Sequence, residues 1–147
     1  MLKTRYFSIV IYLVVIIAAL HFLGLTFYLY WILSWFDIVM HFLGGAWVAI
    51  TVIWLLFFSE FSAVKTHSKS PAPTRLSSVA IISAIIVGVG WEIFEYTTGV
   101  TLVSEANYAT DTASDLLMDI IGAFSAALFV VWNEKKLAVK KLPLYEK

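Results

Sequence analysis

The sequence predicts an all-α protein, an integral membrane bundle of four helices whose N- and C-termini are both cytoplasmic. Three observations support this. Of the 147 residues, 61% are hydrophobic and 14% are charged, a composition too apolar for a soluble domain of this size. Four apolar stretches are long enough to cross the hydrocarbon core, which takes about 20 residues. All ten Lys and Arg residues fall in the first residues, one central loop and the tail, as is typical of cytoplasmic segments.

The first span is residues 6–25, directly after Lys3 and Arg5. A signal peptide would also begin with basic residues, but no small-residue cleavage site follows, so an uncleaved membrane helix is the better interpretation. Residues 26–35 carry no charge and are rich in Tyr and Trp, which is typical of a membrane interface. This segment could form a short interfacial helix, or the first membrane helix could extend into it; the sequence allows both.

The other three spans are residues 36–58, 77–96 and 111–132. The loop of residues 59–76 is polar and contains prolines, which disfavour a helix. A basic tail, residues 133–147, completes a single transmembrane domain of residues 1–147. The connections without Lys or Arg should face the extracytoplasmic side of the cell (inner) membrane. No basic patch indicates nucleic acid, and the absence of cysteine excludes disulfides and thiolate metal sites.

Seven of the ten acidic residues lie towards the predicted outer side. At about 100° per residue, Asp111, Asp115 and Asp119 share one face of the fourth span. Asp37 and His41, four residues apart, share a face of the second span. Intramembrane carboxylates are too costly to face lipid, so we expect these faces to meet. Rises of about 1.5 Å per residue place Asp119 about 12 Å below Asp111, which predicts a funnel open to the outside.

The third span adds Glu92 and Glu95, one turn apart, with Gly88 one turn before Glu92. Small residues also continue the faces of the other two spans, and such residues let membrane helices approach closely. These residues are Gly44 and Gly45 on the second span and Gly122 and Ala126 on the fourth. The three faces are therefore expected to converge on one buried acidic site.

Carboxylates together with imidazole form a ligand set suited to Mg, Mn, Fe or Zn. No Lys or Arg lies nearby to neutralise the carboxylates, so a divalent metal ion is the predicted cofactor. The predicted ligands are Asp37, His41, Glu92, Glu95, Asp115 and Asp119, with Asp111 as a further candidate. Among them, the candidates for catalytic groups are Glu92, Asp119 and His41.

Simpler interpretations exist for some of these residues. Asp37 and Asp111 lie where two helices should begin, so capping is as good an interpretation as metal binding. His21 is more often a packed interfacial residue, and Glu105 fits a solvated loop. Trp91 and Tyr96 suit the aromatic belt. Ser114 and Ser125 flank the acidic strip without an evident base, which disfavours serine catalysis.

The motifs DIVMHF (Asp37, His41), GVGWEIFE (Gly88 to Glu95) and DLLMDIIG (Asp115 to Gly122) resemble those of the VanZ-like membrane proteins and the related YjdF-type inner-membrane family. The resemblance covers roughly residues 36–128 and implies a four-helix inner-membrane fold. VanZ-like members commonly have Gln at the position of Glu95 and Asn at that of Asp119. The more acidic site of this chain is therefore nearer to the YjdF type, and the glycopeptide resistance associated with the VanZ-like group is not carried over.

Three functions fit the predicted site. The first is metal binding, with metal-dependent chemistry on a lipid-linked substrate or another envelope component. The second is a transporter or sensor that binds cations or protons. In the third, the polar network only holds the bundle together. The lipid bilayer is the one partner that all three require, and the sequence does not set the oligomeric state.

Overall fold

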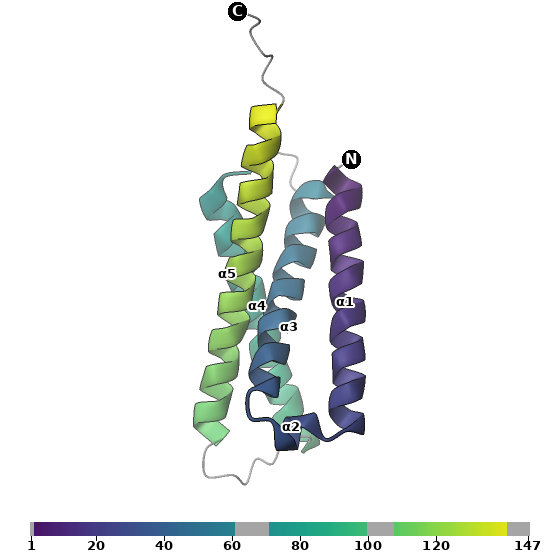
Figure 1. Ribbon diagram of the computed structural model, residues 1–147. Helices are drawn as coiled ribbons and strands as arrows, with labels where there is room; N and C mark the ends of the chain where they lie inside the picture. The colour runs from purple at the N-terminus through teal and green to yellow at the C-terminus, as the bar shows by residue number, and fades with distance from the viewer. Residues whose placement is uncertain (1, 61–70, 100–107, 141–147) are drawn as a thin grey trace, which may run out of the picture.

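Four long helices form the bundle in this computed structural model, which describes residues 2–60, 71–99 and 108–140 (Figure 1). They are α1 (Leu2–Thr26), α3 (Phe36–Ile53), α4 (Pro73–Thr98) and α5 (Tyr108–Lys140), and no strand occurs in the described ranges. α3 continues directly into a π-helical turn, η1 (Trp54–Phe58). All four resulting spans are long and apolar enough to cross a membrane. The predicted all-α membrane bundle is therefore confirmed.

The helix bounds differ from the prediction mainly at the ends remote from the acidic residues. α3 and η1 together cover the predicted 36–58. α4 begins at Pro73 rather than at 77, because a proline in the first turn forfeits no helical hydrogen bond and is favoured there. α5 begins at Tyr108 and runs to Lys140, so half of the predicted tail is helical. Lys and Glu are good helix formers, and lysines near a helix C-terminus are favourable.

A four-residue helix, α2 (Leu29–Ile32), lies between the first two spans. Of the two alternatives left open for residues 26–35, the structure shows the short helix, and α1 ends at Thr26. Tyr28 takes a left-handed conformation (φ 56°) just before α2, which reverses the chain. A Cβ at Gly24 would lie 2.6 Å from the Tyr30 ring and 2.7 Å from the Phe36 ring. Glycine at position 24 thus lets α2 fold back against the end of α1.

α3 is the central helix of the bundle. It packs against α1, α4 and α5, whereas among the described residues no Cα of α1 lies within 8 Å of a Cα of α4 or α5. The core between α3, α4 and α5 is built largely from alanines that are at most 1% exposed: Ala49, Ala80, Ala84, Ala123 and Ala127. Small residues allow close backbone approach where lipid supplies no hydrophobic drive between helices.

Two glycines mark the closest approach, between α3 and α5. A Cβ on Gly45 would meet the carbonyl oxygen of Asp119, and a Cβ on Gly122 would meet the carbonyl oxygen of Phe42. Backbone atoms cannot move aside as the end of a side chain can. The two helices can therefore cross at this distance only with glycine at both positions, which fixes the height of Asp119 against α3.

The bundle has one end that we call the acidic end, where α3 begins, α4 ends and α5 begins. α1 begins and α5 ends at the opposite end (Figure 1). The start of α1 and the end of α5 lie at the same end of the bundle, as expected when the number of spans is even. The cytoplasmic location of the termini remains a prediction, made from the distribution of Lys and Arg.

At the end opposite the acidic end, one hydrogen bond joins α1 to α5. The Tyr6 hydroxyl donates to Glu134 Oε1 over 2.9 Å, and Tyr6 is 1% exposed. Tyr6 also packs on Phe58, with ring centroids 4.8 Å apart. This bond links helices whose backbones do not touch.

Replacing Tyr6 by Phe is expected to lower the free energy of unfolding by about 1 kcal/mol, since the ring still packs and only the hydrogen bond is lost. Unfolding in mixed detergent and denaturant micelles would measure the change. Tyr12→Phe is the matched control, because Tyr12 is 69% exposed and its loss of a hydroxyl should be neutral. Equal stability of Tyr6→Phe and wild type would contradict the role of this bond.

Candidate functional site

His41 is the centre of the acidic site. It lies on α3, one turn after Asp37, and is 7% exposed. Its Nε2 atom is 3.8 Å from Asp37 Oδ1 and 3.9 Å from Asp115 Oδ2. Its Nδ1 atom is 3.5 Å from Asp119 Oδ2. The two ring nitrogens thus face different carboxylates, two on one side and one on the other.

Asp37, His41 and Asp115 form a group able to hold a metal ion. One donor atom from each lies within 4.8 Å of the others. In a tetrahedral site with metal–ligand distances of about 2.0–2.2 Å, two ligand atoms are about 3.3–3.6 Å apart, so a movement of about 1 Å would bring the three donor atoms onto one ion. The structure therefore brings these three predicted ligands together, from α3 and α5.

Asp119 approaches the histidine from the opposite side. Its carboxylate lies against Gly88 of α4, where a Cβ would meet Oδ2. The absence of a side chain at position 88 thus makes room for the carboxylate beside the imidazole. Metal-binding histidines usually donate their second N–H to such a carboxylate, which orients the ring.

Two buried carboxylate oxygens have no hydrogen-bond partner among the described residues. They are Asp115 Oδ1 and Glu92 Oε1, on side chains of residues that are 3% and 8% exposed. The other oxygen of Glu92 accepts a hydrogen bond from the Thr112 hydroxyl at 2.7 Å. Buried polar atoms are nearly always satisfied in proteins, so these oxygens indicate a cation, a proton or another donor that protein side chains do not provide.

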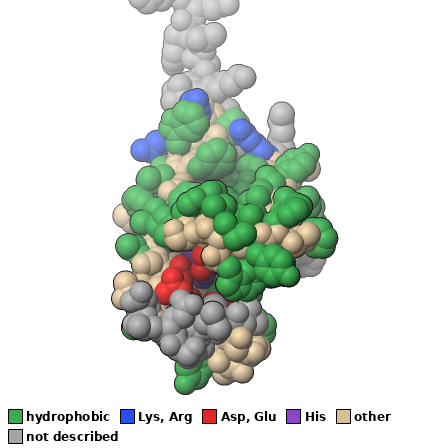
Figure 2. Space-filling model, turned by 60° about the horizontal axis from the view of Figure 1, so that its bottom comes forward, with side chains coloured by type: hydrophobic (Ala, Val, Ile, Leu, Met, Phe, Trp, Pro, Cys, Tyr) green, Lys and Arg blue, Asp and Glu red, His purple; other side chains and the backbone are tan. Residues whose placement is uncertain are grey.

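The described basic side chains lie far from these acids. Arg5, Arg75, Lys135 and Lys136 are at the starts of α1 and α4 and near the end of α5. Figure 2 shows the carboxylates and the histidine at the acidic end, with Lys and Arg at the other. The separation of charges inferred from the sequence is therefore present in the fold, and no Lys or Arg from the described ranges pairs with the site.

The capping interpretation fails for Asp37. The residue before α3 is Trp35, it makes no side-chain capping bond, and Asp37 is inside the first turn. Asp111 also lies within the first turn of its helix, since α5 begins at Tyr108, and it is exposed. A favourable dipole interaction remains for both, but only Asp37 joins the donor group.

The remaining predicted residues lie around the cluster. Glu95 is half-buried on α4, one turn after Trp91, and is close enough to Asp37 for the two carboxylates to repel. Trp91, which the sequence assigned to the aromatic belt, also lines the site. His21 is exposed and lies 2.8 Å from the Tyr30 hydroxyl, which fits its interpretation as a packed residue. Glu105 lies outside the described residues.

Two residues near the site escaped the sequence analysis. Thr112 bonds Glu92, and its position three residues before Asp115, on the same helical face, was an available signal. Tyr30 of α2 faces the site from the chain reversal. Burial, with the nearby carboxylates of Asp37 and Glu95, raises the pKa of Tyr30 to about 12. Only the fold-back of α2 brings it there, and no spacing indicated it.

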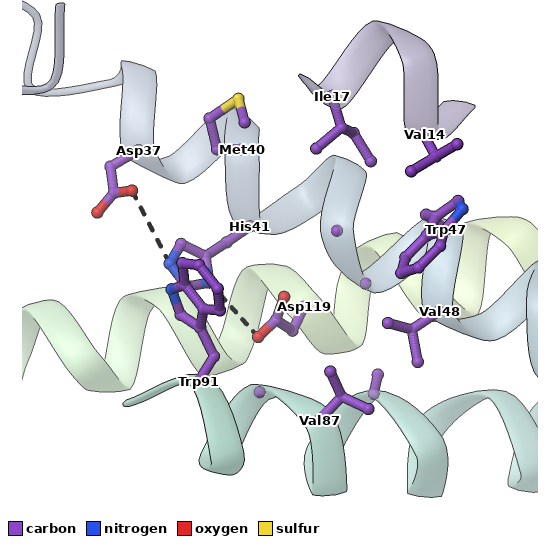
Figure 3. Close-up of a pocket in the computed structure, with 14 residues that line it drawn as sticks. Val14, Ile17, Asp37, Met40, His41, Trp47, Val48, Val87, Trp91 and Asp119 are labelled. Carbon is purple, nitrogen blue, oxygen red and sulfur yellow. Dashed lines mark hydrogen bonds and ion pairs between the residues drawn. The ribbon is translucent and has the colours of Figure 1, made fainter. Parts of the chain in front are cut away.

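A cavity of about 230 Å³ adjoins the cluster. Asp37, His41 and Asp119 form its polar end, and valines, Ile17 and Trp47 line the rest (Figure 3). Ser114 and Ser125 bond the carbonyl oxygens of Thr110 and Ile121 on their own helix. Those bonds use both hydroxyls locally, in line with the expectation against serine catalysis.

A family model described as a predicted membrane protein (DUF2238) matches residues 2–136. YjdF-type proteins are of this family, so that part of the sequence resemblance is supported. The VanZ-like part remains a prediction. No curated protein and no solved structure matches the chain.

Proposed function

This chain belongs to the DUF2238 family of predicted membrane proteins, and we propose that it binds one divalent metal ion through Asp37, His41 and Asp115. The observation that carries the proposal is the environment of His41. Its Nε2 faces two carboxylates, its Nδ1 faces a third, and a buried oxygen of Asp115 has no partner among the described side chains. A cation bound by Nε2 and both carboxylates would compensate those charges.

In this proposal Asp119 orients the histidine rather than binding the metal. A proton on Nδ1 would be donated to Asp119, which leaves the Nε2 lone pair free for the ion. One imidazole with two carboxylates favours Mn, Fe or Zn over Mg, because Mg prefers oxygen ligands and retained water.

Three protein ligands leave coordination positions open, as in catalytic rather than structural metal sites. A water or substrate oxygen at such a position would be polarised by the ion. Glu92, with one buried oxygen that has no partner among the described residues, is the candidate general base, and His41 and Asp119 would act through the metal. We propose metal-dependent chemistry on a membrane or envelope component as the function of the open site.

Ion transport is the second candidate, and the cavity argues against it. Its wall beyond the polar end consists of Val14, Ile17, Trp47, Val48, Ala84 and Val87. An ion path needs polar groups or water along its length. The site therefore fits a pocket that ends within the bundle better than a channel across it.

Metal binding can be measured on the purified full chain in detergent, after chelation and titration with Mg, Mn, Fe or Zn. We expect one ion per chain for wild type. Asp119→Asn should keep that stoichiometry while the affinity falls by about 10–100-fold, the usual effect of losing a partner of a metal-bound histidine.

Asp111→Asn is the matched control, since Asp111 is an exposed acid of the same helix and should leave the affinity unchanged. Absence of binding with all four metals would refute the proposal. Wild-type affinity in Asp119→Asn would refute the orienting role alone. A melting transition unaffected by metal or chelator would favour a network that serves the bundle only.

A further inference from the structure

The cavity beside His41 extends along the bundle as an apolar groove. It begins at Asp37 and ends at Val48, both on α3, whose Cα atoms are about 16 Å apart at about 1.5 Å per residue. Figure 3 shows the polar side chains at one end and Trp47, Val48 and Val87 at the other. The groove therefore runs parallel to the helices, the direction that lipid chains take in a bilayer.

Two helices that do not touch form the sides of this groove. Val14 and Ile17 come from α1, and Ala84, Val87 and Trp91 from α4. Within the described residues no Cα of α1 is within 8 Å of one of α4, so the floor between them is formed by α3, with Asp119 of α5 beside it. In a membrane-spanning bundle, such a gap opens sideways towards the hydrocarbon of the bilayer.

A glycine and one indole hydrogen bond shape the floor and the far end of the groove. Gly44 leaves the floor free of a side chain, and a Cβ there would have only Asp119 Oδ1 nearby, at 3.9 Å. At the far end Trp47 donates its indole N–H to the carbonyl oxygen of Val10 over 3.2 Å. That bond holds the indole between α3 and α1 and fixes the depth of the groove.

The size of the groove selects among apolar occupants. Its volume of about 230 Å³ is below the range of about 300–1,000 Å³ typical of pockets for whole ligands. A helix of a partner or of a second copy, about 10–12 Å wide with its side chains, cannot enter. One flexible hydrocarbon chain, lying along the bundle, matches both the shape and the apolar lining.

The polar end of the groove determines the charge of the head group. Asp37 is partly exposed there, Glu95 is half-buried beside it, and Trp91 is 44% exposed. Carboxylates bind ammonium groups through charge-assisted hydrogen bonds, and an indole face attracts a cation. These residues stand near the ends of α3 and α4, at the level where head groups lie. An anionic head group would meet only like charge.

We propose that this groove binds one hydrocarbon chain of a membrane lipid whose head group carries a primary ammonium, held by Glu95 beside Trp91. The chain would lie against Gly44, Val48 and Val87. This binding does not require the metal ion, so the lipid site and the metal site can be tested separately on the same preparation.

Native mass spectrometry of the full chain in detergent would test the proposal, with dioleoyl phosphatidylethanolamine and dioleoyl phosphatidylglycerol as probes. The chains are identical, so a difference reports the head group. We expect one bound lipid per chain and an affinity for the ethanolamine lipid about tenfold above that for the glycerol lipid. Equal binding, tighter binding of the anionic lipid, or a dimer without lipid would overturn the proposal.

Two variants separate the chain site from the head-group site. Val87→Trp should fill the groove and lower the affinity for both lipids at least tenfold. Ile86→Trp is the control, because Ile86 is the neighbouring and more exposed residue, and it should leave both affinities unchanged. Glu95→Gln should weaken binding of the ethanolamine lipid and leave binding of the glycerol lipid unchanged or tighter. Lipid binding that Val87→Trp and Glu95→Gln both leave intact would overturn the assignment.

Metal content measured on the same samples distinguishes the two proposals. Neither Val87→Trp nor Glu95→Gln alters a proposed metal ligand, so both should keep the ion. Metal bound without any lipid would refute the lipid site only, and lipid bound without any metal would refute the metal site only.

Discussion

Replacing His41 by Ala is expected to abolish metal binding, with less than a tenth of an ion retained per chain under conditions that saturate wild type. His41 supplies the only nitrogen of the donor group and stands between Asp37 and Asp115. Its removal leaves carboxylates that repel each other and a ligand set with one member missing. Elemental analysis of the purified variant after metal loading gives the stoichiometry directly.

His21→Ala is the matched control, because His21 is exposed and bonds Tyr30 instead of the acidic cluster. It should bind metal as wild type does. Asp37→Asn provides a second test if His41→Ala does not fold, since Asp37 is partly exposed and its loss perturbs packing least. Full occupancy in both His41→Ala and Asp37→Asn would disprove the assigned site.

Gly122→Ala is expected to destabilise the bundle by about 1–3 kcal/mol or more, the usual cost of forcing an extra group into a packed core. The new Cβ would meet the carbonyl oxygen of Phe42, a backbone atom of α3. α5 would have to move away from α3, carrying Asp115 and Asp119 with it. Both the unfolding midpoint in denaturing micelles and the metal affinity should therefore fall.

Gly90→Ala is the control for this substitution. Nothing lies within 4 Å of a Cβ at Gly90, and alanine is favoured over glycine in a helix by about 0.5–1 kcal/mol. Gly90→Ala should therefore leave the bundle as stable as wild type or slightly more stable. A neutral Gly122→Ala would show that α3 and α5 are less closely packed than described.

The sequence predicted the spans well because membrane insertion imposes a strong pattern of length and hydropathy. It also predicted the meeting of Asp37, His41, Asp115 and Asp119, because acids at helical spacing have only one acceptable direction in a membrane. The helix starts at Pro73 and Tyr108 were set too late. The polar residues around these two positions are typical of loops, although proline is favoured in the first turn of a helix.

Other features of the site depend on tertiary contacts that no spacing encodes. Asp111 and Asp115 share a helical face, yet only Asp115 is buried, because the packing partner covers that face unevenly along its length. His41 can lie near both Asp37 of its own helix and Asp119 of α5 only if α3 and α5 pack at one particular height relative to each other. The groove between α1 and α4 could not be predicted either, since α1 is apolar on every side and no single face of its sequence marks a partner.

The pairing of α3 with α5 has a consequence for the order of synthesis. Chains are made from the N-terminus, so Asp37 and His41 are in place while α5 is still to be made. α5 then delivers Asp115 and Asp119 together with Gly122, the residue that lets it dock. A chain that stops after α4 therefore has half of the candidate site and no partner across from His41. The site is therefore complete only once α5 has been made and has docked on α3.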